Sequence, residues 1–432
     1  LALDHVRSAG WESHFAHSGL RVGLVWAGNP SHKNDANRSV DFAALAPLWS
    51  LEGVHFYSFQ VGARSADLDS LTPEQRAKVT DMSPLLQNFG DTAAALVHVD
   101  LLVCVDTSIC HVAGALGIPV WLLIPWMPDW RWLLHREDSP WYPSLRILRQ
   151  PAYRDWDSVL HTLGKDLKEL AHPQSAGGKR RQQAAHALVE QGRVLLERNE
   201  PALARPAFWQ ALRECPTHAR AASALAIAAF RAGDTHAALM LGARACRQSP
   251  NDPENWSNCG AYLKAVGDLP ATLACFERGI AVRPDYAGLI YNRGLARLLA
   301  GDLPGGFADY ERRFDVPDFP SKRLQTPKPL WQGQPLPDQT LLIHAEQGLG
   351  DTLQFLRYIA LLPKPIKRVL LLIQESLTSL PVLPAHVELV HEGAPTPHFD
   401  VVCPLLSLPH LLCPQLPGTD ALNIPQTIPY LA

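Results

Sequence analysis

Short apolar runs and helical patterns alternate over the first part of the chain. The run at 101–105 is apolar throughout, which is typical of a strand buried on both faces of a parallel sheet. Apolar residues then recur on one helix face over 109–116, and a second apolar run follows at 120–124. Strand, turn, helix and strand in this order make the βαβ unit of a parallel sheet, so we expect a Rossmann-like α/β lobe over residues 1–171. Further strands are expected at 21–27, 54–60 and 145–148, and helices at 40–49, capped by Ser39, and at 155–171.

A different period governs the middle of the chain. Pro216, Pro250 and Pro284 are spaced by 34 residues, and Gly-Asp pairs recur at the same spacing. Helix, Gly-Asp turn, helix and proline with this period are typical of tetratricopeptide repeats. We expect about four repeats over 183–315, after a polar linker at 172–182. Such arrays offer a concave surface to a protein or peptide, and a mere spacer or dimer contact is the alternative.

The last part of the chain returns to strands and helices. Residues 316–338 are rich in proline and lack periodicity, so we expect an extended connector. A strand at 340–344 and a helix after residue 352 then begin a second, shorter α/β lobe over 339–432. The predicted fold class is therefore α/β plus all-α, with two Rossmann-like lobes flanking a helical repeat array.

Composition excludes several classes of protein. Of 432 residues, 47% are hydrophobic and 19% charged, as in a globular chain, and the net charge of −3 argues against broad nucleic-acid binding. No apolar run is long enough to span a bilayer, and residues 1–10 resemble neither a signal peptide nor a transit peptide. None of the eight cysteines forms a C-x-x-C pair, so neither a zinc site nor a disulfide framework is indicated, and we expect a cytoplasmic protein.

Candidate chemistry gathers where the strands of the first lobe end. Thr107 and Ser108 follow a strand directly and precede a helix that carries His111, and a helix N-terminus is a natural seat for a phosphate. Lys33 and Arg38 lie on the loop after the first strand. Because loops at the carboxyl ends of parallel strands converge, we expect these groups to surround one crevice suited to a diphosphate. The alternatives are that Asp106 and Thr107 only cap the helix and that the two cations belong to a solvated loop.

Aromatic residues crowd the segment after the strand at 120–124. They are either packed against the lobe or form a stacking wall for a base or a sugar. The residues concerned are Trp126, Trp130, Trp132, Trp141 and Tyr142.

Four segments of the first lobe resemble the carboxyl-terminal lobe of bacterial glycosyltransferases of the GT-B fold. They read RVGLVWAGNPSHKNDANRSV, YSFQ, VDTSICHVAGALGIPVW and DWRWLLHREDSPWYPSLRILRQ. They are most similar to the heptosyltransferase-like group (glycosyltransferase family 9, with O-GlcNAc-transferase-like members) that is fused to tetratricopeptide repeats. The resemblance implies a donor lobe in which Lys33, Thr107, Ser108 and His111 contact the phosphates of a nucleotide sugar. It makes Asp106 a structural partner at the turn, and Asn29, Gln60 and Asp106 are further candidates for contacts with the substrate.

The glycine-rich stretch of the last lobe, HAEQGLGDTLQFLRY, resembles the first such loop of the same group. It lacks the third glycine of a dinucleotide fingerprint and the Gly-Lys-Thr of a P-loop, so NAD and ATP are weak proposals. On the residues alone, Asp351 caps a helix. The resemblance instead makes Asp351 the candidate general base, with Glu346, Gln347 and Gln354 as candidate substrate contacts.

The order of the two lobes is reversed relative to that group. In the family, the glycine-rich lobe precedes the donor lobe. Two readings of the reversal stay open. In one, the chain is a window from a tandem protein in which 1–171 ends one transferase and 339–432 begins the next. In the other, the chain is a circularly permuted enzyme.

We therefore expect a glycosyltransferase that moves a sugar from a nucleotide-diphosphate sugar to a hydroxyl acceptor. Asp351 would take the acceptor proton, and the cations and the helix terminus would stabilise the leaving diphosphate. We expect no metal and no cofactor besides the nucleotide sugar, and a protein or peptide on the repeats. The alternative is a non-catalytic repeat scaffold with incomplete lobes, which would show neither donor hydrolysis nor transfer. A dinucleotide oxidoreductase is a third, weaker hypothesis.

Overall fold

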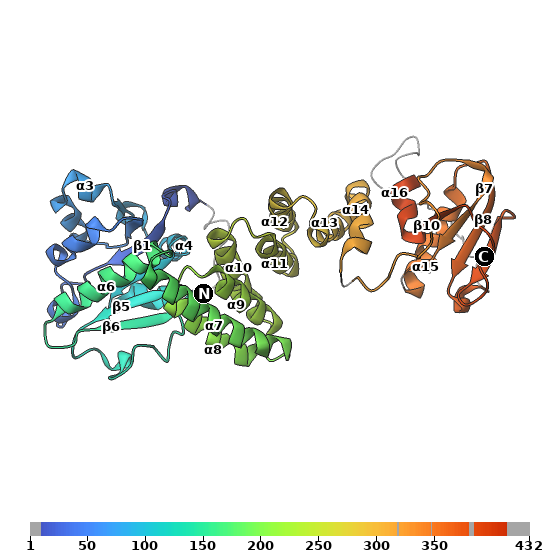
Figure 1. Ribbon diagram of the computed structural model, residues 1–432. Helices are drawn as coiled ribbons and strands as arrows, with labels where there is room; N and C mark the ends of the chain where they lie inside the picture. Colours follow the sequence, from blue (N-terminus) through green and yellow to red (C-terminus); the bar gives the residue numbers. More distant parts are fainter. Residues whose placement is uncertain (1–9, 318, 347, 380–383, 413–432) are drawn as a thin grey trace. The chain divides into compact units, whose positions relative to one another are not determined.

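The computed structural model describes residues 10–317, 319–346, 348–379 and 384–412. They belong to two compact units, residues 1–250 and residues 251–432 (Figure 1). No helix among the described residues combines the length and the apolar composition that a membrane-spanning segment needs.

The first unit contains a six-stranded, fully parallel sheet in the order β3-β2-β1-β4-β5-β6. All the strands expected from the sequence are present, and β3 was not predicted because a three-residue strand shows no period. The strand order changes direction between β1 and β4, where ligands bind in open α/β sheets. The strands are β1 (Leu20–Val25), β2 (Val54–Ser58), β3 (Val79–Asp81), β4 (Leu101–Val105), β5 (Val120–Ile124) and β6 (Leu145–Arg149).

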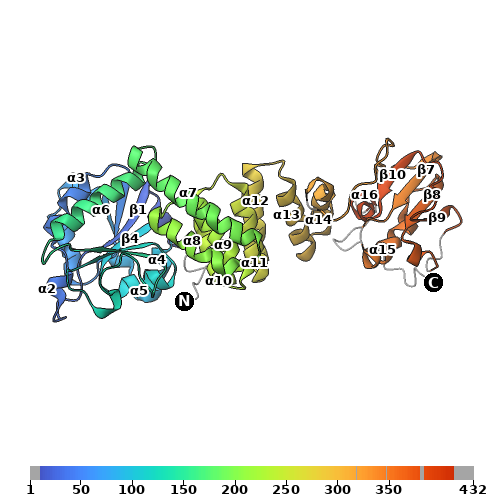
Figure 2. The same cartoon turned by 60° about the horizontal axis from the view of Figure 1, so that its bottom comes forward.

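Helices cover both faces of this sheet. Figure 2 shows α4 (Phe89–Leu96) and α5 (Ser108–Ala115) on one face and α6 (Trp156–Ala171) on the other. Strands β4 and β5 are buried along their whole length, which explains why they read as continuous apolar runs. Shorter pieces are α2 (Asp35–Arg38), α3 (Pro73–Arg76) and the 3₁₀ helices Glu12–Phe15, Phe42–Ser50, Ala63–Ser70, Ser83–Leu85 and Trp130–Trp132.

Two local predictions for this unit are wrong. The segment expected as an α-helix at 40–49 is the 3₁₀ helix Phe42–Ser50, and it contains Pro47, which cannot donate the hydrogen bond of an α-helix. Its cap is Asp41, because the Ser39 hydroxyl instead accepts from the Gly28 amide at 3.0 Å. The expected linker at 172–182 is mostly helical, since Ser175 caps α7.

The repeats form antiparallel helix pairs, as the period of 34 predicts. The first unit holds two pairs and the second unit holds two more. Close helix contact explains the recurring glycines: a Cβ on Gly192 would clash with the ring of Phe208, and one on Gly260 with Phe276. The helices are α7 (Ala176–Glu197), α8 (Pro201–Glu214), α9 (Ala219–Arg231), α10 (Thr235–Gln248), α11 (Pro253–Ala265), α12 (Leu269–Val282), α13 (Ala287–Leu299) and α14 (Leu303–Tyr310).

In the first unit, the repeats are joined to the α/β lobe by arginines. The guanidinium of Arg244, 5% exposed, donates to the carbonyl of Asp100 at 2.5 Å. Arg247 donates to the Val97 carbonyl at 2.6 Å and Arg213 to the Pro143 carbonyl at 2.6 Å. These three hydrogen bonds, of which that of Arg244 is buried, fix the first two repeats to the α/β lobe.

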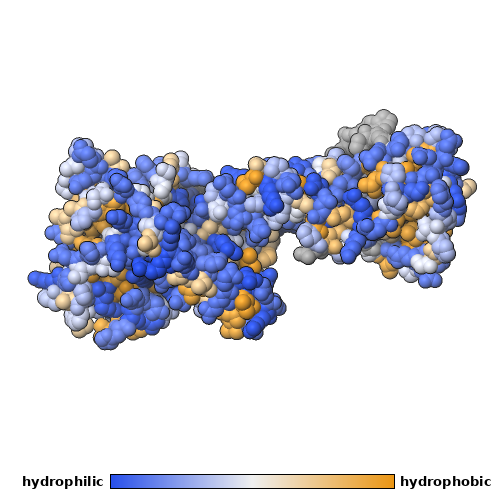
Figure 3. Space-filling model, viewed as in Figure 1, coloured by the Kyte–Doolittle hydropathy of each residue, from blue (hydrophilic) through white to orange (hydrophobic). Residues whose placement is uncertain are grey.

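The second unit contains a four-stranded parallel sheet in the order β10-β7-β8-β9. The expected connector at 316–338 is in part a piece of this lobe: Trp331 is 2% exposed, its amide donates to the Val402 carbonyl, and β7 already begins at Leu336. In the view of Figure 3 the surface of both units is mainly hydrophilic, with small apolar areas between. The elements are β7 (Leu336–His344), β8 (Ile366–Ile373), β9 (Val387–His391), β10 (Val401–Pro404), α15 (Leu349–Phe355), α16 (Leu408–Leu412) and the 3₁₀ helices Glu311–Asp315, Leu356–Leu361, Glu375–Leu377 and Leu405–Ser407.

Candidate functional site

A cavity of about 490 Å³ lies at the carboxyl ends of β1, β2 and β4 in the first unit. Three segments line it, one after each strand: 27–30, 59–64 and 107–109. It therefore sits where the strand order reverses, and the N-terminus of α5 opens into it. The volume is within the range of roughly 300–1,000 Å³ that is usual for small-molecule sites.

The first turn of α5 leaves two backbone amides, those of Ser108 and Ile109, without an acceptor among the described residues. Thr107 occupies the N-cap position, but its hydroxyl donates to the Val105 carbonyl at 3.3 Å and makes no capping hydrogen bond. The interpretation of Thr107 as a side-chain cap is thus wrong. Within the described residues, no acceptor bonds to the amides of Ser108 or Ile109, and free amides with a partial positive charge suit an anion.

The loop after β1 meets the β4–α5 turn, as the topology predicts. The guanidinium of Arg38 donates to the Asp106 carbonyl at 2.9 Å and pairs with the Asp35 carboxylate at 3.3 Å. Part of the charge of Arg38 is therefore compensated. Lys33 is exposed on the same loop and is not among the residues that line the cavity.

Asn29 and Gln60 both line the cavity, and the side chains of both also accept hydrogen bonds from backbone amides. The side-chain carbonyl of Gln60, 3% exposed, accepts from the amides of Trp26 at 3.2 Å and Ala27 at 3.0 Å. That of Asn29 accepts from the Ser31 amide at 2.9 Å. These bonds shape the end of β1 and the loop that follows it.

Arg64 lines the cavity, and the sequence did not single it out. It lies in the 3₁₀ helix Ala63–Ser70, and its guanidinium is 3.7 Å from the carboxylate of Asp67. The available signal was a cation four residues after Gln60, in a loop already expected at the same edge of the sheet.

The aromatic segment after β5 holds His111 in place. Trp132 is fully buried and stacks on the His111 ring with centroids 5.5 Å apart, and the Tyr142 hydroxyl is 3.0 Å from His111 Nδ1. A hydrogen bond with Cys110 raises the pKa of His111, against the lowering effect of burial. For Trp132 and Tyr142, packing is the confirmed alternative, whereas Trp126, Trp130 and Trp141 are exposed.

Asp106, Cys110 and His111 form the group of potential metal ligands found in the described part of the chain. Their ligand atoms lie within 4.8 Å of one another. A mixed set of oxygen, sulfur and nitrogen is of the kind that Zn²⁺ binds. The cluster lies at the positive end of α5, which opposes a cation.

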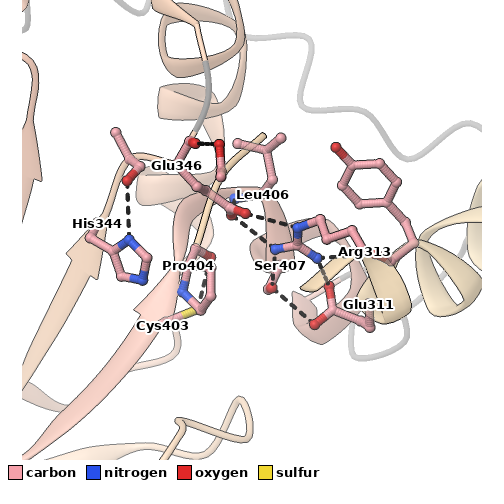
Figure 4. A network of polar contacts seen from close by, with 11 residues as sticks. Glu311, Arg313, His344, Glu346, Cys403, Pro404, Leu406 and Ser407 are labelled. Carbon is pink, nitrogen blue, oxygen red and sulfur yellow. Dashed lines mark hydrogen bonds and ion pairs between the residues drawn. The ribbon is translucent and has the colours of Figure 1, made fainter. Parts of the chain in front are cut away.

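Both carboxylate oxygens of Glu346, in the second unit, belong to an ion pair with Arg313 (Figure 4). Its two carboxylate oxygens lie 2.8 and 2.9 Å from Arg313 Nε and Nη2, and one also accepts from the Leu406 amide at 3.0 Å. Both side chains of the pair are 0% exposed, and Arg313 donates further to Ser407 and Glu311. Glu346 therefore offers no exposed oxygen to the substrate contact that the sequence suggested.

The other candidates of the second unit lie on α15. Gly348 is its N-cap, so the interpretation of Asp351 as the cap is wrong. Asp351 is half-buried in the first turn and makes no hydrogen bond or ion pair to the described residues. Gln354 is exposed, and its backbone carbonyl accepts from Arg357 at 3.0 Å. Gln347 lies outside the described residues.

Comparison with known proteins identifies the repeats. The family model described as tetratricopeptide repeat matches residues 189–253. The curated protein FlbA of Caulobacter vibrioides is 25% identical over 201 residues, which cover 38% of this chain. The chain spans about a third, 34%, of the length of FlbA.

Solved structures share local likeness with the chain. One is a mutant O-GlcNAc transferase of Thermobaculum terrenum (17% identity, 45% of this chain and 38% of that chain, TM-score 0.30). Another is the second repeat domain of human RPAP3 in complex with an HSP70 peptide (12% identity, 27% and 98% covered, TM-score 0.26). TM-scores this low do not establish a shared fold. The chain thus contains tetratricopeptide repeats, a protein-interaction module, together with parallel α/β lobes.

Proposed function

We propose that the first unit binds the donor of a nucleotide-sugar-dependent glycosyltransferase, with the diphosphate at the N-terminus of α5. The observation that carries the proposal is the 490 Å³ cavity at the switch point, where the amides of Ser108 and Ile109 are free. Free amides, two hydroxyls and nearby cations suit a diphosphate. His111 in α5 and Arg38, which donates to the Asp106 carbonyl, supply positive charge near this terminus, and Lys33 is proposed to reach the diphosphate from the loop after β1.

In the proposed reaction, a hydroxyl of the acceptor attacks the anomeric carbon of the sugar. The bond from that carbon to the diphosphate oxygen breaks, and the nucleoside diphosphate leaves with the electron pair. In the second unit, taken by itself, Asp351 is proposed as the base that an acceptor lobe needs to take up the hydroxyl proton, because its carboxylate is not engaged by the described residues. The positive charge around the N-terminus of α5 is proposed to stabilise the leaving diphosphate. The repeats would recruit a protein partner or acceptor, as arrays of this type do through their concave face.

Calorimetric titration of the whole chain with ADP, GDP, UDP and CDP tests the donor site. We expect one of them to bind, and to bind at least about tenfold more weakly to a Lys33→Ala, His111→Ala double variant. Lys165→Ala, an exposed lysine on α6, is the matched control and should bind like the wild type. No binding of any nucleoside diphosphate to the wild type contradicts the donor site.

A non-catalytic repeat scaffold is the second candidate function, favoured by the family match at 189–253. Release of nucleoside diphosphate from nucleotide sugars separates the two candidates, because a scaffold releases none.

A further inference from the structure

A second cavity, of about 650 Å³, lies at the same edge of the first sheet. Its walls come from the loop after β1, the segment after β5 and the turn between β6 and α6. Arg64 lines both this cavity and the one at the N-terminus of α5. The two spaces are therefore neighbouring parts of one ligand-binding edge.

Aromatic side chains form one side of the second cavity. Trp126 and Tyr153 are 47% and 67% exposed, and half-buried Trp156 is the first residue of α6. One contact holds the backbone at Trp126, and another brings a cation to the Tyr153 ring. The Trp126 amide donates to Gln150, a 2% exposed side chain, at 3.0 Å, and the Arg154 guanidinium lies 5.3 Å from the centre of the Tyr153 ring. Large aromatic rings exposed side by side on the wall of a cavity are a feature of binding surfaces.

Planar polar side chains form the other side. Asp41 uses one carboxylate oxygen for the Ala43 amide, which leaves the other free to accept. The Asn37 amide nitrogen donates to Asn34 at 2.7 Å, so its carbonyl faces no described donor. Arg64 adds several N–H donors and is held only by a 3.7 Å contact with Asp67. The cavity thus presents donors and acceptors together.

We propose that this cavity binds a pyranose ring of a saccharide. A pyranose has an apolar C–H face that stacks on aromatic rings, and hydroxyls that both donate and accept. The aromatic side of the cavity matches the first property, and Asn37, Asp41 and Arg64 match the second. Two guanidinium groups, of Arg64 and Arg154, and one carboxylate, of Asp41, line the cavity, so it is the aromatic side that favours a saccharide over an isolated phosphate. The polar side disfavours a lipid chain.

The role of the saccharide rests on the proposed function: beside a donor diphosphate, the ring is a unit of the acceptor or the sugar to be transferred. The binding itself does not depend on a nucleotide. Failure of one proposal can therefore be told from failure of the other.

The test is saturation-transfer NMR and calorimetry of the whole chain with methyl glucoside, methyl mannoside, methyl galactoside and N-acetylglucosamine, without nucleotide. We expect one of these to bind the wild type and to bind about tenfold more weakly to Trp126→Ala or Tyr153→Ala. Trp130→Ala is the matched control, because Trp130 is 65% exposed and does not line the cavity. Tyr153 is largely exposed, so its variant should keep the thermal stability of the wild type.

Three results would overturn the proposal. The first is that none of the four saccharides binds the wild type, and the second is that Trp130→Ala loses as much affinity as Trp126→Ala. The third is that free uridine or adenosine binds the wild type but not the same variants, which would reassign the cavity to a base. Saccharide binding without binding of any nucleoside diphosphate supports the cavity and contradicts the donor site. Binding of a nucleoside diphosphate without binding of any saccharide supports the donor site and contradicts the saccharide cavity.

Discussion

The β4–α5 turn and the β7–α15 turn occupy equivalent places, each following an inner strand of a parallel sheet at its carboxyl end. At the first turn, Thr107 and Ser108 line a cavity, and the amides of Ser108 and Ile109 have no acceptor among the described residues. At the second turn, Glu346 is fully buried and both its oxygens are bound by Arg313. The same topological position thus borders a cavity in one lobe and holds a buried ion pair in the other.

The difference comes from what lies against each turn. Arg313 belongs to the 3₁₀ helix at Glu311–Asp315, directly after the last repeat helix. The central carbon of its guanidinium lies 4.4 Å from the centre of the Phe314 ring. A buried guanidinium needs a carboxylate, and Glu346 supplies it. The first turn faces no such residue, since Arg38 bonds only the carbonyl of Asp106 there. A polar residue after a parallel strand is therefore a candidate for a binding site only if its side chain is not already paired with a buried residue of opposite charge.

The largest effect is expected from Arg313→Leu, which leaves the carboxylate of Glu346 buried without its partner. We expect the second unit to lose about 3–5 kcal/mol of unfolding free energy. Urea unfolding of the whole chain measures this loss. The control is Arg368→Leu, whose pair with Glu388 is 41% and 49% exposed and should be worth at most about 1 kcal/mol. Equal losses in both variants would remove the contrast between the turns.

Gly114→Ala should disturb the first turn through packing. A Cβ at this position would lie 2.5 Å from the Tyr142 ring, which holds His111. Overpacking of this kind costs about 1–3 kcal/mol, measured by thermal unfolding. In the control Gly164→Ala, on α6, the nearest atom is Leu48 Cδ2 at 3.7 Å, so the helix should gain roughly 0.5–1 kcal/mol. A neutral Gly114→Ala would show that Tyr142 is free to move.

Binding at the first turn should depend on pH through His111. Its pKa is raised, so the imidazolium, which attracts a diphosphate, persists to higher pH than usual and is lost as pH rises through that value. We expect the affinity for the bound nucleoside diphosphate to fall about tenfold across this titration, and the fall to be missing in His111→Gln. Calorimetry at a series of pH values checks both. Parallel pH profiles for the two proteins would place His111 away from the phosphates.

The smallest change in stability is expected from Asp351→Asn. The carboxylate has no bond to the described residues, so the free energy of unfolding should change by less than about 0.5 kcal/mol. A loss as large as that of Arg313→Leu would mean that both carboxylates of this turn are structural. If Asp351 is the base of the proposed reaction, transfer falls by roughly 10²–10⁴-fold in a stably folded variant.

Local periodicity predicted most of the architecture. The repeats follow from a 34-residue period because each helix pair contacts its neighbours, and the strands at 101–105 and 120–124 follow from continuous apolar runs. The errors have local causes as well: Pro47 turns an expected helix into a 3₁₀ helix, and Ser175 begins α7 earlier than the polar composition suggested. Parallel topology also predicted that the loops after β1 and β4 meet, which the Arg38–Asp106 hydrogen bond confirms.

The sequence by itself determined which segments become strands, repeats and loops, and that polar loops gather at one edge of the first sheet. Only the tertiary structure decided which polar groups stay available there. Glu346 is paired by a residue 33 positions earlier, Trp132 covers His111, and Arg64 comes to line two cavities. The physical reason is that secondary structure follows from short-range periodicity. The burial and pairing of a charge depend instead on side chains that folding brings from distant parts of the chain.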